Sequence, residues 1–283
     1  MKKILNDFNE LVMFKHSIFS LPFIFTAMVV AAKGWFGWRL FFLGLLAAIS
    51  ARNFAMGFNR YLDRDIDAKN PRTANRPSVD GRISANKQLL FIAINGVIFI
   101  SVAYYINSLA FKLSIPILLI LGLYSLFKRF SSLAHLMLGV SLGLAPIAGV
   151  VAVSKSIPLW SLLLSSGVIF WVAGFDLLYS LQDIEFDKKQ KLYSIPSIYG
   201  PKCTLFISKI FHALTLLFWL FFVIAYKGAI FAYIAILISA LMLFYEHKIV
   251  EKDFKKIDKA FFTVNGYLGI IFFCFILLDI WMR

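Results

Sequence analysis

The chain has 283 residues, of which 60% are hydrophobic, 17% aromatic and only 16% charged. Soluble domains carry about a quarter charged residues, and a single core of this size could not hide so much apolar surface from water. The formal net charge is +14. The basic residues that produce it lie between apolar runs, so membrane topology and anionic lipid headgroups explain this charge better than binding to nucleic acid does. We therefore expect an all-α, polytopic membrane protein with no nucleic-acid partner.

The apolar segments predict about nine membrane spans after an interfacial helix at 1–15. Most of them reach the ~20 residues that a bilayer requires. The expected spans are 17–33, 38–58, 88–107, 113–127, 132–153, 157–181, 203–225, 229–245 and 261–282. The two cysteines, Cys203 and Cys274, are far apart in apolar segments and match no metal spacing or disulfide framework.

The nine-span topology places most of the 29 Lys and Arg residues on the side of the N-terminus. By the positive-inside rule, this side is the cytoplasm of a bacterial-type inner membrane. The two longest loops on that side, 59–87 and 183–202, are rich in Asp, Arg and Asn. We expect residues 1–283 to form one integral membrane domain whose active-site loops cap the bundle on the cytoplasmic side.

The first acidic cluster follows the second span. Asn59, Asp63 and Asp67 are spaced i, i+4 and i+8, which would stack an amide and two carboxylates along one helical face. Hard oxygen ligands of this kind suit Mg²⁺, which completes its shell with phosphate and water. A single acidic pair could equally belong to a solvated helix with salt bridges to Arg60 or Arg64.

A second cluster at the end of the sixth span strengthens the metal interpretation. Asp183 and Asp187 are again four residues apart, and Asp176 lies two turns deeper on nearly the same face. An ionisable side chain at that depth is expensive and functional by default. Tyr179 shares the face and could hydrogen-bond a phosphate or a carboxylate. Two such pairs at corresponding helix ends predict two metal sites.

Cationic residues accompany both clusters. The loop 70–77 is stiffened by two prolines and carries Arg72 and Arg76, and arginine is suited to bidentate phosphate recognition. Lys128 and Arg129 follow the fourth span. Two acidic pairs facing fixed cations can clamp a diphosphate and let it depart. Above an apolar bundle, this predicts a lipid-tailed diphosphate whose allylic C–O bond ionises, with aromatic rings nearby stabilising the cation.

The order of these residues resembles the UbiA-type intramembrane prenyltransferases over nearly the whole chain. The pattern is Asn59-x3-Asp63-x3-Asp67, Arg72-Thr-x2-Arg76-Pro77, Tyr124-x3-Lys128-Arg129 and Asp176-x6-Asp183-x3-Asp187. It is most similar to the 4-hydroxybenzoate polyprenyltransferase branch of quinone biosynthesis. The segment 52–60, with Arg60 where many members have Asp, also resembles members that would prenylate 1,4-dihydroxy-6-naphthoate in menaquinone biosynthesis.

The resemblance implies a polyprenyl diphosphate donor, an aromatic acceptor and a residue-by-residue assignment. One Mg²⁺ would bind Asn59, Asp63 and Asp67, and the other Asp183 and Asp187. Arg72 and Lys128 would contact the diphosphate, Arg129 or Arg76 the carboxylate of the acceptor, and Asp183 or Asp176 would remove the ring proton. The histidines have a simpler interpretation: His16 as an interfacial residue, and His135, His212 and His247 as residues without functional partners.

Other classes of protein fit less well. A secondary transporter would place its ionisable residues near the bilayer midplane in interrupted helices, whereas these acids gather at helix ends. A CDP-alcohol phosphotransferase needs its acidic motif in one continuous stretch, which is not present. Relatives that prenylate haem, homogentisate or chlorophyllide remain open as alternatives within the family.

Overall fold

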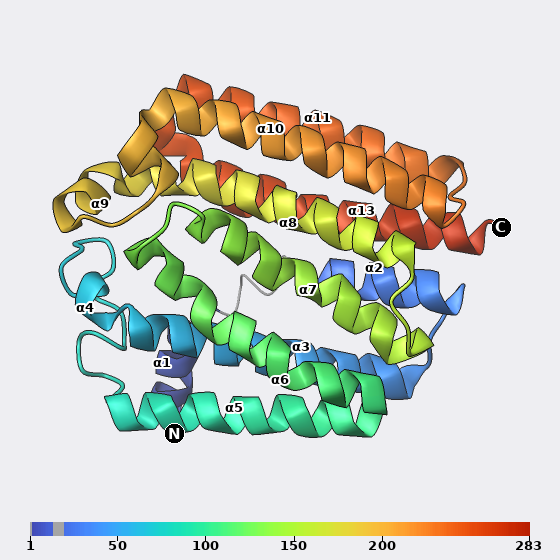
Figure 1. Ribbon diagram of the computed structural model, residues 1–283, viewed down its shortest axis with the longest axis horizontal. Helices are drawn as coiled ribbons and strands as arrows, with labels where there is room; N and C mark the ends of the chain where they lie inside the picture. The colour runs from blue at the N-terminus through green and yellow to red at the C-terminus, as the bar shows by residue number, and fades with distance from the viewer. Residues whose placement is uncertain (1, 14–19) are drawn as a thin grey trace.

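The computed structural model describes residues 2–13 and 20–283, and all regular structure in these two ranges is helical. Figure 1 shows the long helices lying side by side in one bundle. They are α2 (Leu21–Ala32), α3 (Trp38–Leu62), α5 (Ala85–Ile106), α6 (Ser108–Leu123), α7 (Ala134–Ser154), α8 (Leu159–Ser180), α10 (Ile195–Ala225), α11 (Ile230–Lys252) and α13 (Asn265–Trp281). The short ones are α1 (Lys2–Val12), α4 (Arg64–Asp67), η2 (Tyr124–Arg129), η3 (Leu181–Asp183), α9 (Ile184–Gln190), η4 (Phe254–Lys256), α12 (Ile257–Lys259) and the π-helix η5 (Ala260–Val264).

The described residues confirm an all-helical membrane protein. Eight helices are long and apolar enough to cross a bilayer, and α2 is a shorter apolar helix. The prediction of about nine spans is therefore consistent with the structure. Two predicted spans were drawn too short, because the fourth helical segment covers 108–129 and the eighth covers 230–252. Large apolar side chains exposed on the outer helices face the lipid, among them Leu90, Val97, Phe206 and Leu241.

The helix α8 lies at the centre of the bundle, between α7 and α10 (Figure 1). Small residues allow this close approach, because a Cβ on Gly139 of α7 would lie 2.3 Å from the carbonyl oxygen of Ile169. Between helices in lipid, such packing replaces the hydrophobic effect as the main source of association. An aromatic core around Phe23, Trp171 and Trp219 fills the space beside α8. This packing fixes α8 as the scaffold for one of the acidic clusters.

The two acidic clusters emerge at the same end of the bundle. In Figure 1, α4 and α9 both project at the left, whereas the C-terminus lies at the right. The helix α1 lies beside α3, and its Phe8 ring stacks on Phe91 of α5 at 4.7 Å. Arg82, which follows Gly81 at φ +88°, joins α1 to the loop that leads into α5 by pairing with Glu10 at 2.6 Å.

Candidate functional site

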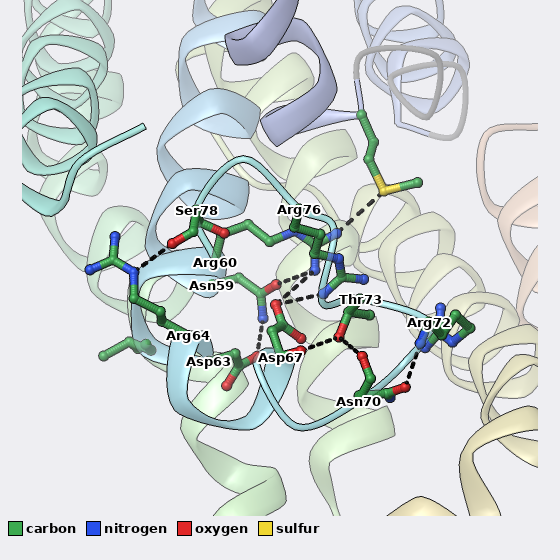
Figure 2. Close-up of polar contacts among 12 residues, drawn as sticks. Asn59, Arg60, Asp63, Arg64, Asp67, Asn70, Arg72, Thr73, Arg76 and Ser78 are labelled. Atoms are coloured by element: carbon green, nitrogen blue, oxygen red, sulfur yellow. Dashed lines mark hydrogen bonds and ion pairs between the residues drawn. The ribbon is translucent and has the colours of Figure 1, made fainter. Parts of the chain in front are cut away.

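The first acidic pair stands on either side of a bend. The helix α3 ends at Leu62, Asp63 leaves helical geometry (φ −92°, ψ 6°), and α4 resumes to Asp67. The prediction of one unbroken helical face was therefore wrong in this detail. The side chains still meet, since Asn59 Nδ2 donates to Asp63 Oδ2 at 2.9 Å (Figure 2).

The second acidic pair follows a bend of the same kind. The helix α8 continues through η3 into α9, and Asp183 at the junction has φ −105° and ψ 6°. The carboxylate of Asp187 accepts a hydrogen bond from Ser194 Oγ at 2.7 Å. Both pairs thus consist of one Asp at a bend and one Asp a turn later in a short helix. The bends turn both clusters toward the end of the bundle.

The loop after α4 bridges the two clusters. Arg72 donates to Asp183 from Nη2 at 2.5 Å and from Nε at 3.1 Å, and to Tyr179 Oη from Nη1 at 3.1 Å. The side chain of Asn70 accepts a hydrogen bond from the backbone N–H of Arg72 at 3.0 Å (Figure 2). Asn70 also makes a longer contact of 3.4 Å to Asp183. Residues more than a hundred positions apart are therefore in direct contact, as the two-cluster prediction requires.

Basic side chains cover the first acidic pair. Lys128 Nζ lies 2.6 Å from Asp63 Oδ2, and Arg76 Nη1 lies 2.6 Å from Asp67 Oδ2. The two aspartates are only 2% and 5% exposed. Burial raises the pKa of Asp63, and the adjacent ammonium of Lys128 opposes this rise. The predicted phosphate-binding cations are thus present, each in contact with a carboxylate.

The donor chemistry fits a hard divalent cation. In the described part of the chain, no three His, Cys, Asp or Glu side chains already form a metal cage. One carboxylate oxygen, Asp63 Oδ1, is nonetheless buried without a hydrogen-bond partner, although a buried polar atom is ordinarily satisfied. Together with the amide of Asn59 and the nearby aspartates, it offers oxygen ligands of the type Mg²⁺ takes.

Arg129 stands at the edge of this group, with its Nη2 4.0 Å from Asp63 Oδ1, and makes its closest contacts elsewhere. Its guanidinium donates to both oxygens of Asp65, at 2.6 and 3.0 Å, and to the carbonyl of Leu62 at 2.5 Å. The hydrogen bonds from Arg129 lower the pKa of Asp65. Arg129 does not line the cavity described next. It is the one predicted substrate-binding residue that the described structure does not bring there.

A cavity of about 460 Å³ opens beneath the acidic clusters and runs between the helices. On α3 its wall extends from Gly44 to Arg60, which at 1.5 Å per residue is about 24 Å of helix. Most of the wall is apolar. The charged and polar side chains at its mouth are Asn59, Arg60, Arg72, Arg76, Lys128, Tyr179, Asp183 and Asp187. Such a cavity accepts a molecule with one highly charged end and a long apolar tail.

Polar residues also line the cavity below its mouth. Asp176 Oδ2 lies 2.7 Å from His135 Nδ1, and both side chains line the wall. Arg52 and Tyr124 do so as well. Arg52 was not predicted as a site residue, and His135 was expected to have no functional partner. The sequence spacing could have identified Arg52, because it precedes Asn59 by seven residues. Asp176 precedes Asp183 by the same number, so both residues lie two helical turns below an acidic cluster.

A separate buried network ties α8, α11 and α13 together behind the cavity. Trp171 Nε1 donates to Asn265 Oδ1 at 2.8 Å, and Asn265 Nδ2 donates to Glu246 Oε1 at 2.6 Å. Beside it, His212 Nδ1 and His247 Nε2 are 3.0 Å apart. The expectation that these two histidines lack partners was wrong. His16, in contrast, lies outside the described residues.

Comparisons with known proteins bear on this arrangement. Residues 20–276 match the UbiA prenyltransferase family. A solved apo structure of a UbiA homologue from Aeropyrum pernix K1 has a TM-score of 0.85 and 32% sequence identity, covering 93% of this chain and 98% of that one. A UbiA homologue from Archaeoglobus fulgidus bound to GPP and Mg²⁺ has the same fold, with a TM-score of 0.78, 21% identity and coverage of 97% and 99%.

Curated relatives are similar over most of their length. The 4-hydroxybenzoate octaprenyltransferase of Herminiimonas arsenicoxydans is 26% identical over 261 residues, which are 91% of this chain and 90% of the relative. That of Serratia proteamaculans is 29% identical over 226 residues, covering 79% and 77%. The resemblance seen in the motif residues is thus confirmed, and the chain belongs to the UbiA prenyltransferase family.

Proposed function

We propose that this enzyme transfers a polyprenyl group from a polyprenyl diphosphate to a ring carbon of an aromatic hydroxy-carboxylate, with Mg²⁺ as cofactor. The observation that carries the proposal is the contact between Arg72 and Asp183. It joins the loop that follows the first acidic cluster to the second cluster at the mouth of one long apolar cavity. Asn59, Asp183 and Asp187 line this cavity, while Asp63 and Asp67 lie just outside its lining. A polyprenyl diphosphate would place its diphosphate at the charged mouth and its isoprenoid tail in the apolar part of the cavity. The names of the curated relatives favour 4-hydroxybenzoate as the acceptor.

The residues that would hold the metal are Asn59, Asp63 and Asp67 on one side and Asp183 and Asp187 on the other. Bound there, Mg²⁺ would neutralise the diphosphate as it leaves. The basic residues Arg72, Arg76 and Lys128 already balance these carboxylates. Diphosphate oxygens offer them alternative partners of the same charge, so the same side chains would clamp the leaving group.

The chemical step then needs a nucleophile, a stabilised cation and a base. The allylic C1–O bond breaks and its electron pair leaves with the diphosphate. The ring carbon beside the acceptor's hydroxyl forms the new C–C bond, and its proton passes to a carboxylate. Asp176 is our candidate base, because it lines the cavity below the mouth and His135 fixes one of its oxygens. The rings of Tyr179 and Phe261 line the wall nearby and suit the allylic cation.

A second acceptor, 1,4-dihydroxy-6-naphthoate, is favoured by the segment 52–60. Arg60 from this segment is only 7% exposed and lines the cavity, so the residue that departs from the common family pattern stands where it can affect the choice of ring.

For either acceptor we propose one domain over 1–283, with the N-terminus and the acidic clusters on the cytoplasmic side of a bacterial-type inner membrane.

The test uses the purified protein in nanodiscs with Mg²⁺ and a polyprenyl diphosphate. Both acceptors are offered in parallel, and product and pyrophosphate are measured by mass spectrometry. We expect prenylated 4-hydroxybenzoate and an equal amount of pyrophosphate, both abolished by EDTA and restored by Mg²⁺. Product from the naphthoate alone would assign the menaquinone step. If no pyrophosphate is released with the first acceptor and none with the second, the result would contradict prenyl transfer and favour a transporter.

A further inference from the structure

Ser194 is a buried hydroxyl between α9 and α10 that the proposed mechanism has not used. Its residue is only 5% exposed and lines the cavity, as does Asp187. The hydroxyl donates to Asp187 Oδ2 at 2.7 Å. It therefore contacts one of the carboxylates that would hold the metal, on the side of the second acidic cluster.

The start of α10 leaves this hydroxyl little freedom. Ser194 is the N-cap of α10, and its Oγ accepts a hydrogen bond from the backbone N–H of Ser197 at 3.3 Å. In return, Ser197 Oγ accepts from the backbone N–H of Ser194 at 3.1 Å, which completes a capping box. Because the cap uses the oxygen of Ser194 as an acceptor, the single proton of the hydroxyl is free for Asp187.

The backbone beside Ser194 is tied to the first acidic cluster. The N–H of Tyr193 donates to the carbonyl of Lys128 at 2.8 Å, and the ammonium of Lys128 lies 2.6 Å from Asp63. This connection is separate from the one that Arg72 makes. It holds the loop that orients the second acidic pair at a fixed place relative to the first.

The two carboxylates of the second pair have different kinds of partner. Both oxygens of Asp183 accept from the guanidinium of Arg72. Among the described side chains, no Lys or Arg lies within ion-pair distance of Asp187, and its Oδ1 accepts no hydrogen bond from them. A neutral hydroxyl fixes the orientation of a carboxylate without balancing its charge, so the charge of Asp187 remains for a cation.

We propose that Ser194 is a positioning residue for the metal that the second acidic pair would bind. Its hydroxyl holds Oδ2 of Asp187 and leaves Oδ1 as the ligand atom. This inference rests on the proposed function. Hydrogen-bond partners that orient a metal ligand are typically worth about 10–100-fold in metal affinity. Ser194 acts through Asp187, so its removal should weaken the metal and spare the chemical step.

The experiment counts bound ions directly, with Mn²⁺ in place of Mg²⁺ and the electron paramagnetic resonance signal of free Mn²⁺ as the readout. The protein in nanodiscs is titrated in the presence of a thio analogue of the polyprenyl diphosphate, whose C–S bond resists ionisation. We expect two bound ions in the wild type. Ser194→Ala should weaken one of them about tenfold and leave the other within twofold, and Ser194→Thr, which keeps the hydroxyl, should restore the affinity.

Turnover gives a second, independent readout. In Ser194→Ala, the Mg²⁺ concentration for half-maximal pyrophosphate release should rise about tenfold. The kcat at saturating Mg²⁺ and the KM for the polyprenyl diphosphate should stay within threefold of the wild type. A serine that only capped α10 would not separate these quantities.

The matched control is Ser197→Ala. It removes the other half of the capping box but not the contact with Asp187, and Ser197 does not line the cavity. It should leave both Mn²⁺ affinities unchanged, even if thermal unfolding occurs earlier. A double-mutant cycle adds a sharper test: on an Asp187→Asn background, Ser194→Ala should weaken Mn²⁺ less than threefold further, because both changes act on one ligand.

Each other outcome overturns the assignment. A single bound ion in the wild type, two unchanged affinities in Ser194→Ala, equal weakening of both ions, or full additivity in the double variant would each do so. If Ser194→Ala does not fold, Ser194→Gly decides the matter, because glycine lacks the hydroxyl and costs little at an N-cap.

Failure of the proposed function is distinguishable from failure of this inference. If the wild type binds two ions and loses one in Ser194→Ala, but releases no pyrophosphate, the proposed function is wrong and the role of Ser194 stands. If the wild type makes product and Ser194→Ala keeps both ions, only the assignment of Ser194 is wrong.

Discussion

Charges at the mouth of the cavity are balanced pair by pair. Asp63 and Asp67 are buried, yet each has a basic partner at 2.6 Å. Removing one member of a buried pair leaves an uncompensated charge and costs about 3–5 kcal/mol. Truncation to Ala would therefore confuse loss of function with loss of fold. Asparagine keeps the shape and one acceptor oxygen, so Asp→Asn variants separate the two effects.

We predict that Asp183→Asn lowers pyrophosphate release at least a hundredfold at saturating substrates. The carboxylate contacts Arg72 across the two clusters and is one of the proposed metal ligands. The control is Asp65→Asn, since Asp65 also pairs with an arginine but its side chain is 61% exposed and outside the cavity. It should change activity less than about threefold. Equal losses in the two variants, measured by a coupled pyrophosphate assay, would contradict the metal-site assignment.

The contact of His135 with Asp176 predicts a graded effect on kcat. A positioned base contributes roughly 10²–10⁴ in rate, and His135 holds this one by a single 2.7 Å contact. His135→Leu should reduce kcat at least tenfold with little change in KM for the polyprenyl diphosphate. His135→Gln should recover part of the loss, because an amide N–H can still donate to Asp176. Indistinguishable kcat values for the two variants would show that the histidine only fills space.

These residue contacts mark the limit of prediction from sequence. The acidic pairs were predictable because their members are close in the chain and repeat a spacing. The contacts of His135 with Asp176 and of Arg129 with Asp65 join residues 41 and 64 positions apart. No periodicity encodes such pairs, because helix packing decides them.

Among the secondary-structure elements, the membrane helices could be predicted from the sequence, whereas the bends that interrupt them could not. Hydropathy located the membrane helices, since a span must be long and apolar. The bends at Asp63 and Asp183 were not expected, because neither segment contains the Pro or Gly that usually marks a helix break. Both bends carry near-identical dihedral angles in equivalent positions. They place the second Asp of each pair in a short helix of its own.

The loop that carries Arg72 and Arg76 is tied to α1 by Arg82, which contacts Asp7, Glu10, Asp80 and the carbonyl of Asn75. Exposed ion pairs contribute at most about 1 kcal/mol each, so Arg82→Ala should barely change thermal stability. We predict faster hydrogen exchange in 68–84 and a several-fold higher KM for the polyprenyl diphosphate. Lys69→Ala, an exposed residue of the same loop, is the control. Unchanged exchange in the Arg82 variant would show that the loop orders itself.

The network behind α8 predicts a change in stability without a change in catalysis. Asn265→Ala removes the amide that Trp171 Nε1 and Glu246 Oε1 both contact, and leaves the buried Glu246 Oε1 without this hydrogen bond. Unsatisfied buried polar groups cost about 1–3 kcal/mol each, so the variant should unfold several degrees below the wild type. Ser239→Ala, which removes only a bond to Ala235 within α11, should shift the midpoint much less. Thermal unfolding in detergent compares them, and equal shifts would contradict an interhelical role.

Over the whole molecule, the cavity determines which part of the substrate meets which helix. Its charged mouth lies at the end where α4 and α9 project, and its apolar wall continues along α3 and α7 toward the other end. A long isoprenoid would thus lie roughly parallel to the helices, with its diphosphate at the acidic clusters. The length of tail that the enzyme accepts then depends on side chains far from the chemistry.

Narrowing the cavity should therefore discriminate between donors by length. Ala145 lies on the cavity wall of α7, eleven residues, or about 16 Å, beyond the start of that helix. We predict that Ala145→Phe lowers kcat/KM for a long polyprenyl diphosphate at least tenfold, about 1.4 kcal/mol, and leaves geranyl diphosphate within threefold. Ala93→Phe, an exposed position on α5, is the control and should affect neither donor. Parallel losses with both donors in the Ala145 variant would show that the tail lies elsewhere.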